Sequence, residues 1–134
     1  MLKAVILAGG QGTRLAPYTT ILPKPLMPLH DMPIAEVVVR QLKRAGIRDI
    51  TFAVGYLSSL VQAYFGNGRK WGARIRYSEE GKPLGTAGPL ARIPDLRSTC
   101  VVMNGDVLTT LDLKDMVRFH RKRRAVATIG MFRK

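Results

Sequence analysis

A glycine-rich segment follows the first apolar run of this 134-residue chain. Residues 9–12 read Gly-Gly-Gln-Gly, and a backbone of this kind can approach a ligand closely and turn its N–H groups toward it. Phosphate oxygens suit such an arrangement, and Arg14 places a permanent forked cation beside it. The segment therefore predicts a phosphate-binding turn. A purely structural glycine turn is the less favoured interpretation, because further chemistry follows along the chain.

A lysine held between two prolines is the next candidate group. Lys24 lies between Pro23 and Pro25, ten residues beyond Arg14. A stiff backbone lowers the entropy lost when the ammonium group meets an anion. We therefore expect Lys24 to bind the same ligand as the glycine-rich turn.

Two familiar phosphate loops are excluded by the residues after Gly12. A Walker A loop requires Gly-Lys-Ser/Thr after its second glycine, whereas Thr13 and Arg14 stand here. A dinucleotide fingerprint requires glycine or alanine where Leu15 stands, and no acidic residue ends a second strand.

An aspartate follows a later apolar run, at Asn104-Gly105-Asp106. A carboxylate at the end of a buried strand can hold a Mg²⁺ that also binds phosphate oxygens. By themselves these three residues favour a turn or a helix cap. The presence of the glycine-rich turn in the same sequence reverses that preference, and the two motifs together predict a metal site at Asp106.

A third polar segment lies between these two motifs, at residues 79–88. Gly85 and Gly88 allow close backbone approach, and Thr86 is a candidate first residue of a helix. A loop in this position is suited to contact a nucleotide base through Glu80 and backbone amides.

Strands that alternate with helices are expected to position these groups. The apolar patterns predict strands at 3–7, 49–54, 74–78, 100–103 and 125–132, and helices at 33–45, 58–65 and 112–122. The strand at 74–78 alternates in polarity and is expected at a sheet edge. Four prolines between residues 17 and 28 predict an extended segment without helix. The expected fold is α/β: a Rossmann-like, open, mostly parallel sheet with helices on both faces.

Composition narrows the class of protein. The chain has 46% hydrophobic residues and a formal net charge of +13, so it can form a core and its partner is expected to be anionic. One cysteine, Cys100, excludes an internal disulfide framework and suits a reducing cytoplasm. No export or membrane-spanning stretch is present, so a cytoplasmic location without membrane partners is expected. Arg118 to Arg124 is the densest basic cluster; it reads as a solvated helix end, with polyanion binding less favoured.

The length predicts one domain, residues 1–134, and the end of the chain suggests that this domain is incomplete. The chain stops two residues after the last predicted strand, so we expect the front part of a larger α/β protein, truncated at its C-terminus. Uncovered core surface and a free sheet edge would then favour a homo-oligomer.

Taken together, the motifs resemble the sugar-1-phosphate nucleotidyltransferases, also called nucleotide-sugar pyrophosphorylases. The resemblance is carried by Leu7-Ala-Gly-Gly-Gln-Gly-Thr-Arg-Leu15 with Pro17 and Thr19, Leu22-Pro-Lys-Pro-Leu-Met-Pro28, Pro83-Leu-Gly-Thr-Ala-Gly88 and Asn104-Gly-Asp106. It runs from Met1 to Lys134. Related molybdopterin-type nucleotidyltransferases keep their lysine closer to the arginine, so the step from Arg14 to Lys24 disfavours them.

The resemblance implies a reaction and a set of roles. The family transfers a nucleoside monophosphate from a nucleoside triphosphate (NTP) to a sugar 1-phosphate and releases pyrophosphate, with Mg²⁺ as cofactor. By resemblance, Arg14 and Lys24 are catalytic and Asp106 holds the metal. The implied nucleotide-binding residues are Leu7, Ala8, Gly9, Gly10, Gly12, Thr13, Glu80, Pro83, Gly85 and Thr86. The run from Pro83 to Pro89 is similar to members that use GTP and mannose 1-phosphate.

Full-length members of that family continue with sugar-binding strands and a second metal-binding aspartate, which this sequence lacks. A truncated, inactive nucleotide-binding or partner-association module is therefore the alternative function. A nucleic-acid-binding protein, suggested by the net charge, is less favoured because no aromatic platform accompanies the basic residues.

Overall fold

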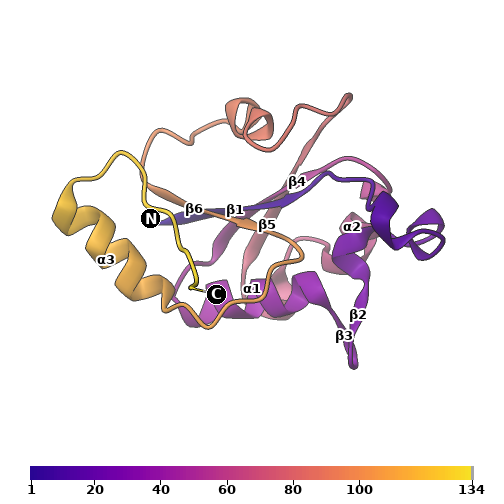
Figure 1. Cartoon of the computed structure of the whole chain (residues 1–134), viewed down its shortest axis with the longest axis horizontal. Helices are drawn as coiled ribbons and strands as arrows, with labels where there is room; N and C mark the ends of the chain where they lie inside the picture. The colour runs from indigo at the N-terminus through magenta and orange to yellow at the C-terminus, as the bar shows by residue number, and fades with distance from the viewer. Residues whose placement is uncertain (134) are drawn as a thin grey trace.

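A four-stranded parallel sheet forms the centre of the computed structural model, which describes residues 1–133 (Figure 1). Its strands are β1 (Lys3–Ala8), β4 (Asp49–Val54), β5 (Arg74–Glu79) and β6 (Cys100–Asn104), in the order β5-β4-β1-β6. The four corresponding predicted strands are confirmed to within one residue at each end. The edge position predicted for 74–78 is also correct.

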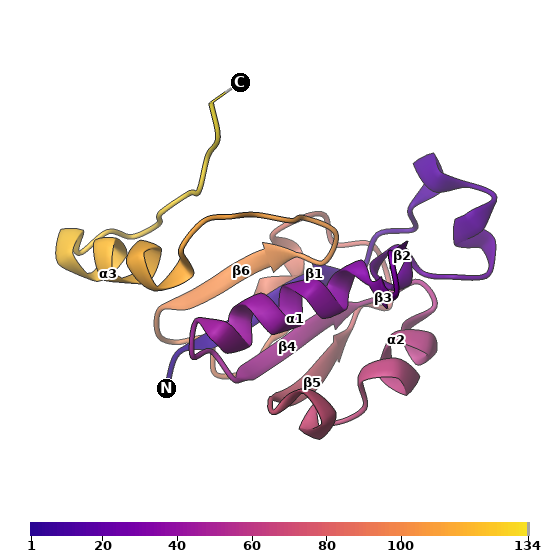
Figure 2. The same ribbon diagram turned by 90° about the horizontal axis from the view of Figure 1, so that it is seen from below.

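Three α-helices pack on one face of the sheet. They are α1 (Ile34–Arg44), α2 (Ser58–Phe65) and α3 (Leu113–Arg123), close to the three predicted ranges (Figure 2). Helix α1 ends where Gly46 adopts a φ of +81°, and the Asp112 side chain caps α3 by accepting from the amides of Lys114 and Asp115. Among residues 1–133, no helix combines the length and the apolar character needed to span a bilayer.

The two faces of the sheet are covered differently. Alternate residues such as Ile6 and Phe52 are fully buried in the core formed with the α-helices. On the other face, Val5 and Ala53 pack against Ile93, which follows a 3-10 helix (Gly88–Arg92). The α/β class with a parallel sheet is confirmed, and the second face is covered by a 3-10 helix and its flanking chain. That helix begins at Gly88 rather than at Thr86, the predicted start.

The segment between the glycine turn and α1 differs from its prediction. Instead of running extended, it forms three 3-10 helices (Thr13–Leu15, Tyr18–Thr20, Lys24–Leu26) and a small hairpin of β2 (Pro28–Leu29) with β3 (Met32–Pro33). Proline excludes α-helix here, but its φ fits the first positions of a 3-10 turn.

The predicted strand at 125–132 is wrong. These residues form no strand, and the side chains of Val126, Ile129, Met131 and Phe132 are between 80% and 102% exposed. The physical reason is pairing: an apolar run becomes a strand only beside another strand, and among residues 1–133 this run pairs with none. It is instead held near α3, where Thr128 Oγ1 lies 3.0 Å from His120 Nδ1. Strand β6 is consequently an outer strand, with Val102 40% exposed.

Two buried carboxylates tie the elements together through hydrogen bonds. Glu36 on α1 accepts hydrogen bonds from the Tyr64 hydroxyl on α2 and from Arg40. Burial would raise the pKa of Glu36, but these hydrogen bonds outweigh it and hold the pKa below its usual value. Burial and the bond to Glu36 raise the pKa of Tyr64 to about 12.

The second buried carboxylate, Asp49, joins β4 to β5. Asp49 is 2% exposed, and its two oxygens lie 2.8 Å and 2.9 Å from guanidinium nitrogens of Arg74 and Arg76. Desolvation opposes the charged form, yet the hydrogen bonds from both arginines lower the pKa of Asp49 below its ordinary value.

Replacement of Asp49 tests this link. Because the folded-state pKa is lowered, the carboxylate contributes stability above its unfolded pKa of about 3.9, and that stability is lost as the pH falls through the folded pKa. Asp49→Asn should lower the free energy of unfolding at pH 7 by about 1–3 kcal/mol, with a smaller difference below about pH 4. Urea unfolding at several pH values measures this. The exposed Asp31→Asn is the control, and an equal loss in both variants would contradict the interpretation.

Candidate active site

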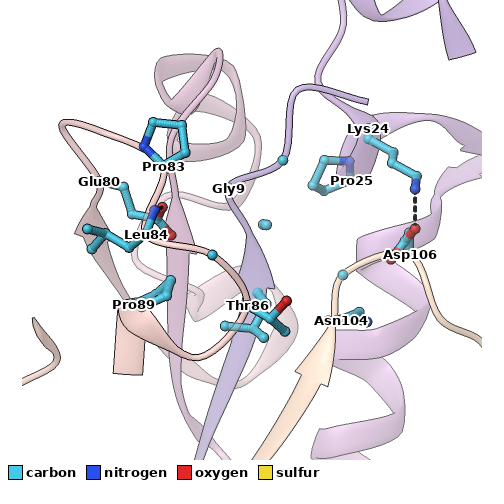
Figure 3. A pocket seen from close by; sticks show the side chains of 15 residues that line it. Gly9, Lys24, Pro25, Glu80, Pro83, Leu84, Thr86, Pro89, Asn104 and Asp106 are labelled. Atoms are coloured by element: carbon cyan, nitrogen blue, oxygen red, sulfur yellow. Dashed lines mark hydrogen bonds and ion pairs between the residues drawn. The ribbon is translucent and has the colours of Figure 1, made fainter. Parts of the chain in front are cut away.

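A cavity of about 410 Å³ opens at the carboxyl ends of the strands. Its walls come from the glycine turn after β1, the segment after β5 and the end of β6, joined by Lys24 and Pro25 (Figure 3). Open parallel sheets bind ligands at this end, and pockets of this size hold small molecules. The lining residues are Leu7, Ala8, Gly9, Gly10, Lys24, Pro25, Glu80, Pro83, Leu84, Gly85, Thr86, Pro89, Asn104, Gly105 and Asp106.

The pairing of β1 with β6 brings two of the predicted motifs together. Leu7 lies opposite Asn104 in the register, and the Gly105 amide donates to the Leu7 carbonyl at 2.9 Å. A Cβ at position 105 would lie 3.2 Å from the side chain of Ile6, so a residue without one allows this close crossing. The glycine turn and Asp106 thus meet at adjacent strand ends although about a hundred residues separate them.

Lys24 and Asp106 form an ion pair in the cavity wall. Lys24 Nζ lies 2.6 Å from Asp106 Oδ2, with the side chains 38% and 31% exposed (Figure 3). Both groups remain accessible from the cavity, so the pair is worth little as a structural ion pair. The pair places one cation and one carboxylate side by side on the cavity wall at the end of β6.

Glu80 lies on the opposite wall, beside Gly9. The Glu80 amide donates to the Val54 carbonyl at 2.9 Å, which fixes the chain directly after β5. A Cβ on Gly9 would lie 2.9 Å from Glu80 Oε1, so glycine makes room for this carboxylate. The other carboxylate oxygen, Oε2, accepts from the Leu84 amide at 3.4 Å. The Glu80 carboxylate therefore faces the same cavity as the glycine turn.

Gly12 joins the glycine turn to the lysine segment. Its φ is +64°, and the buried Thr19 donates its hydroxyl to the Gly12 carbonyl at 2.9 Å. A Cβ here would lie 2.8 Å from Thr19 Cγ2 and 3.2 Å from Lys24 Cβ. Gly12 therefore lets the loop fold back against the segment that carries Lys24.

Most of the predicted site residues line this one cavity. Gly12, Thr13 and Arg14 lie outside its lining, in the loop that projects beyond the end of the sheet (Figure 2). Arg14 is exposed in the first 3-10 helix, Thr13–Leu15. The cavity brings the predicted phosphate motif and the predicted base motif together, whereas Arg14 does not line it.

Five lining residues were not predicted as site residues: Pro25, Leu84, Pro89, Asn104 and Gly105. Each lies within or next to a motif already singled out, so its position beside predicted site residues is the sequence feature that could have identified it. Asn104 and Leu84 add an amide and an apolar side chain to the walls.

The few carboxylates of the site suit a divalent cation such as Mg²⁺ that is bound partly by the protein and partly by a phosphate ligand. Among residues 1–133, no group of three or more His, Cys, Asp or Glu side chains could enclose a metal ion. Mg²⁺ is commonly held by one or two carboxylates together with substrate phosphates and water. Asp106, accessible at the cavity wall, fits that mode and would supply one ligand.

Comparison with known proteins places this geometry in a family. Residues 3–134 match the family described as Nucleotidyl transferase. A UTP–glucose-1-phosphate uridylyltransferase from Synechocystis sp. is 39% identical, covering 96% of this chain and 36% of its own length. A mannose-1-phosphate guanylyltransferase from Mycobacterium tuberculosis is also 39% identical, covering 97% and 37%. A crystal structure from Bacillus anthracis, provisionally named a glucose-1-phosphate thymidylyltransferase, superposes with a TM-score of 0.85 at 30% identity, covering 92% of this chain and 52% of that one.

The chain belongs to the nucleotidyl transferase family. The predicted resemblance to sugar-1-phosphate nucleotidyltransferases is confirmed by these relatives. The chain spans a little over a third of the length of the curated relatives.

Substitution of Gly12 tests the loop geometry. Gly12→Ala should lower the free energy of unfolding by about 1–3 kcal/mol, because a positive φ disfavours alanine and Thr19 blocks the new Cβ. Gly10→Ala is the matched control, since nothing lies within 4 Å of a Cβ at that position. Urea unfolding of both variants measures the difference, and equal stability of the two would refute the packing role of Gly12.

Proposed function

We propose that the cavity binds an NTP together with Mg²⁺ and that the chain serves transfer of a nucleoside monophosphate to a sugar 1-phosphate. The observation that carries the proposal is the convergence of the glycine turn, Lys24, Glu80 and Asp106 on one cavity. These groups supply the chemistry that a nucleotide requires: backbone amides and a cation for phosphates, a carboxylate for the metal and another for the base.

The reaction needs no nucleophile from the protein. An oxygen of the sugar phosphate attacks the α-phosphorus, the bond from that phosphorus to the bridging oxygen breaks, and pyrophosphate leaves. Lys24 would contact the phosphates at the reacting centre, and the glycine turn would hold the chain of phosphates in line. Arg14, which is exposed and outside the cavity lining, would steady the departing pyrophosphate. Bound at Asp106, Mg²⁺ would neutralise developing negative charge on phosphate oxygens.

Glu80 supports guanine as the base. Guanine presents two adjacent donors, N1–H and the exocyclic amino group, and an ionised carboxylate accepts both in parallel. Uracil and thymine present one N–H between two carbonyl oxygens, which repel a carboxylate. The guanylyltransferase name of the Mycobacterium tuberculosis relative supports GTP and mannose 1-phosphate as the substrates. The uridylyltransferase name of the Synechocystis relative shows that base choice varies among similar proteins.

A second candidate is a nucleotide-binding or partner-association module without turnover. It is favoured by one observation: four large apolar side chains at 126–132 are exposed. On that proposal the exposed surface would serve a homo-oligomer or another protein partner. The single half-exposed cysteine, Cys100, suits a cytoplasmic protein under either proposal.

The two candidates differ in turnover. Titration calorimetry with ATP, GTP, CTP and UTP, each with Mg²⁺, measures binding, and release of pyrophosphate with a panel of sugar 1-phosphates measures catalysis. The first proposal requires both signals, whereas binding without release supports the module. Absence of NTP binding would overturn the first proposal and the nucleotide-binding form of the second.

Loss of either charged group at the cavity wall should weaken binding. Lys24→Ala removes the phosphate contact and Asp106→Ala the metal ligand, so each should reduce the affinity for Mg²⁺·GTP about tenfold or more. Asp106→Ala should also flatten the dependence of affinity on Mg²⁺ concentration. Calorimetry measures both effects, and unchanged circular dichroism confirms that the fold is intact. If both variants bind like the parent, the site is assigned wrongly.

Base selectivity depends on the charge of Glu80. Glu80→Gln keeps the shape of the side chain but replaces one acceptor by a donor, so the affinity for GTP should fall about tenfold. The affinity for UTP should rise or stay level, because an amide can pair with a pyrimidine edge. Glu79→Gln is the matched control, since Glu79 lies outside the cavity lining. An unchanged GTP-to-UTP ratio in Glu80→Gln would contradict base recognition by this residue.

A further inference from the structure

A second cavity lies at the opposite end of the sheet from the nucleotide site. Its volume is about 380 Å³. Two of its lining residues lie just before strands: Leu2 directly precedes β1, and Ile47 lies two residues before the start of β4. The cavity therefore opens at the amino ends of these parallel strands. Helix α3 forms its other wall. The proposed chemistry at the carboxyl ends of the strands does not use this cavity.

The cavity has an apolar floor. Ile47, Leu113 and Val117 are between 1% and 9% exposed, and the first two belong to the main core. Leu2 packs against the same core and remains partly exposed, and Ala45 lies at the end of α1. An apolar floor binds an apolar group by removing surface from water, but it cannot hold a fully hydrated small ion.

The rim of the cavity is cationic. Lys114, Arg118 and Arg121 follow one another at steps of four and three residues along α3, so they share one stripe of the helix. The neighbouring stripe, Leu113 and Val117, faces the core. Helix α3 therefore presents three cations above an apolar floor.

The rim cations remain available to a ligand. Arg118 forms an ion pair with Asp115 at 2.9 Å, and both side chains stay mostly exposed at 77% and 63%. In the part of the chain that the structure describes, Lys114 and Arg121 have no carboxylate within 4.0 Å. The basic run 118–124 therefore does not form one uniform surface. Arg121 lines this cavity, while Lys122 and Arg123 lie outside its lining. A wholly solvated helix end would have no such concave apolar neighbour.

We propose that this cavity is a second ligand site, for a small anion with an apolar body, such as an aryl or acyl phosphate or carboxylate. The floor would bury the apolar body, and Lys114 and Arg121 would pair with the anionic group at the rim. Charge complementarity and the apolar floor favour this ligand over a nucleic acid, whose phosphates need an extended cationic surface. The proposal does not depend on the nucleotide site.

The test uses the whole chain and 1-naphthyl phosphate as the probe. Backbone amide NMR signals of Ala45, Ile47 and Val117 should shift saturably, at probe concentrations of about 1 mM or below. Saturating Mg²⁺·GTP should not compete. Inorganic phosphate and neutral 1-naphthol should each bind about tenfold more weakly. Phosphate contacts only the cationic rim, and 1-naphthol contacts only the apolar floor.

Matched charge variants separate the site from general attraction to a basic protein. Lys114→Gln/Arg121→Gln and Lys122→Gln/Arg123→Gln remove the same charge from the same helix. The first should weaken probe binding about tenfold and the second by less than about twofold. Ala45→Leu fills the cavity without changing charge and should also abolish the shifts, while unfolding measurements confirm that it folds.

Each of the following outcomes would overturn the proposal. They are equal weakening in both charge variants, shifts confined to residues 126–132 or to the nucleotide cavity, unaltered binding in Ala45→Leu, and tighter binding of a short DNA duplex that depends on all four cations. The absence of saturable shifts at millimolar probe would do so as well.

Discussion

The parallel pairing of β1 on both of its sides is the constraint on which the rest of the structure depends. Backbone hydrogen bonds join β1 to β4 along one edge and to β6 along the other, so their carboxyl ends meet at one edge of the sheet. The glycine turn leaves β1 at this edge, and Asp106 follows β6 there. The same pairing places the amino ends of the strands together at the far side, where α3 closes the second cavity. One sheet therefore separates two cavities of different chemistry.

On the proposed function, the two charged groups of the cavity wall would exchange partners when the ligand binds. Lys24 and Asp106 pair with each other at 2.6 Å, and both stay accessible. On the proposed function, Lys24 would exchange its carboxylate for a phosphate and Asp106 its ammonium for a divalent cation. Neither charge would then be left alone, because a metal-bound triphosphate offers both signs. The carboxylates that stabilise the fold are different ones, Glu36 and Asp49, which are buried and held by arginines. On the proposed function, binding and stability thus use separate ionic groups.

The net charge of +13 has a structural interpretation that composition does not provide. Arg40, Arg74 and Arg76 pair with the two buried carboxylates, so these three cations serve the fold and add only +1 to the net charge. Another part of the basic excess lies on α3, where some cations surround an apolar cavity and others lie outside it. A basic sequence therefore need not present one continuous surface for a polyanion. The distribution here favours small anions at concave sites.

The sequence by itself determined the local elements and the motifs. Buried apolar runs such as 49–54 and the capped pattern at 112–122 specify a strand and a helix through side-chain periodicity, which is a property of neighbouring residues. It also indicated that Lys24, Glu80 and Asp106 could carry chemistry. Only the tertiary structure decided that these three line one cavity, and that 125–132 is exposed chain rather than a strand. The reason is physical: strand pairing and charge pairing join residues far apart in the chain, and periodicity carries no information about which of them will meet.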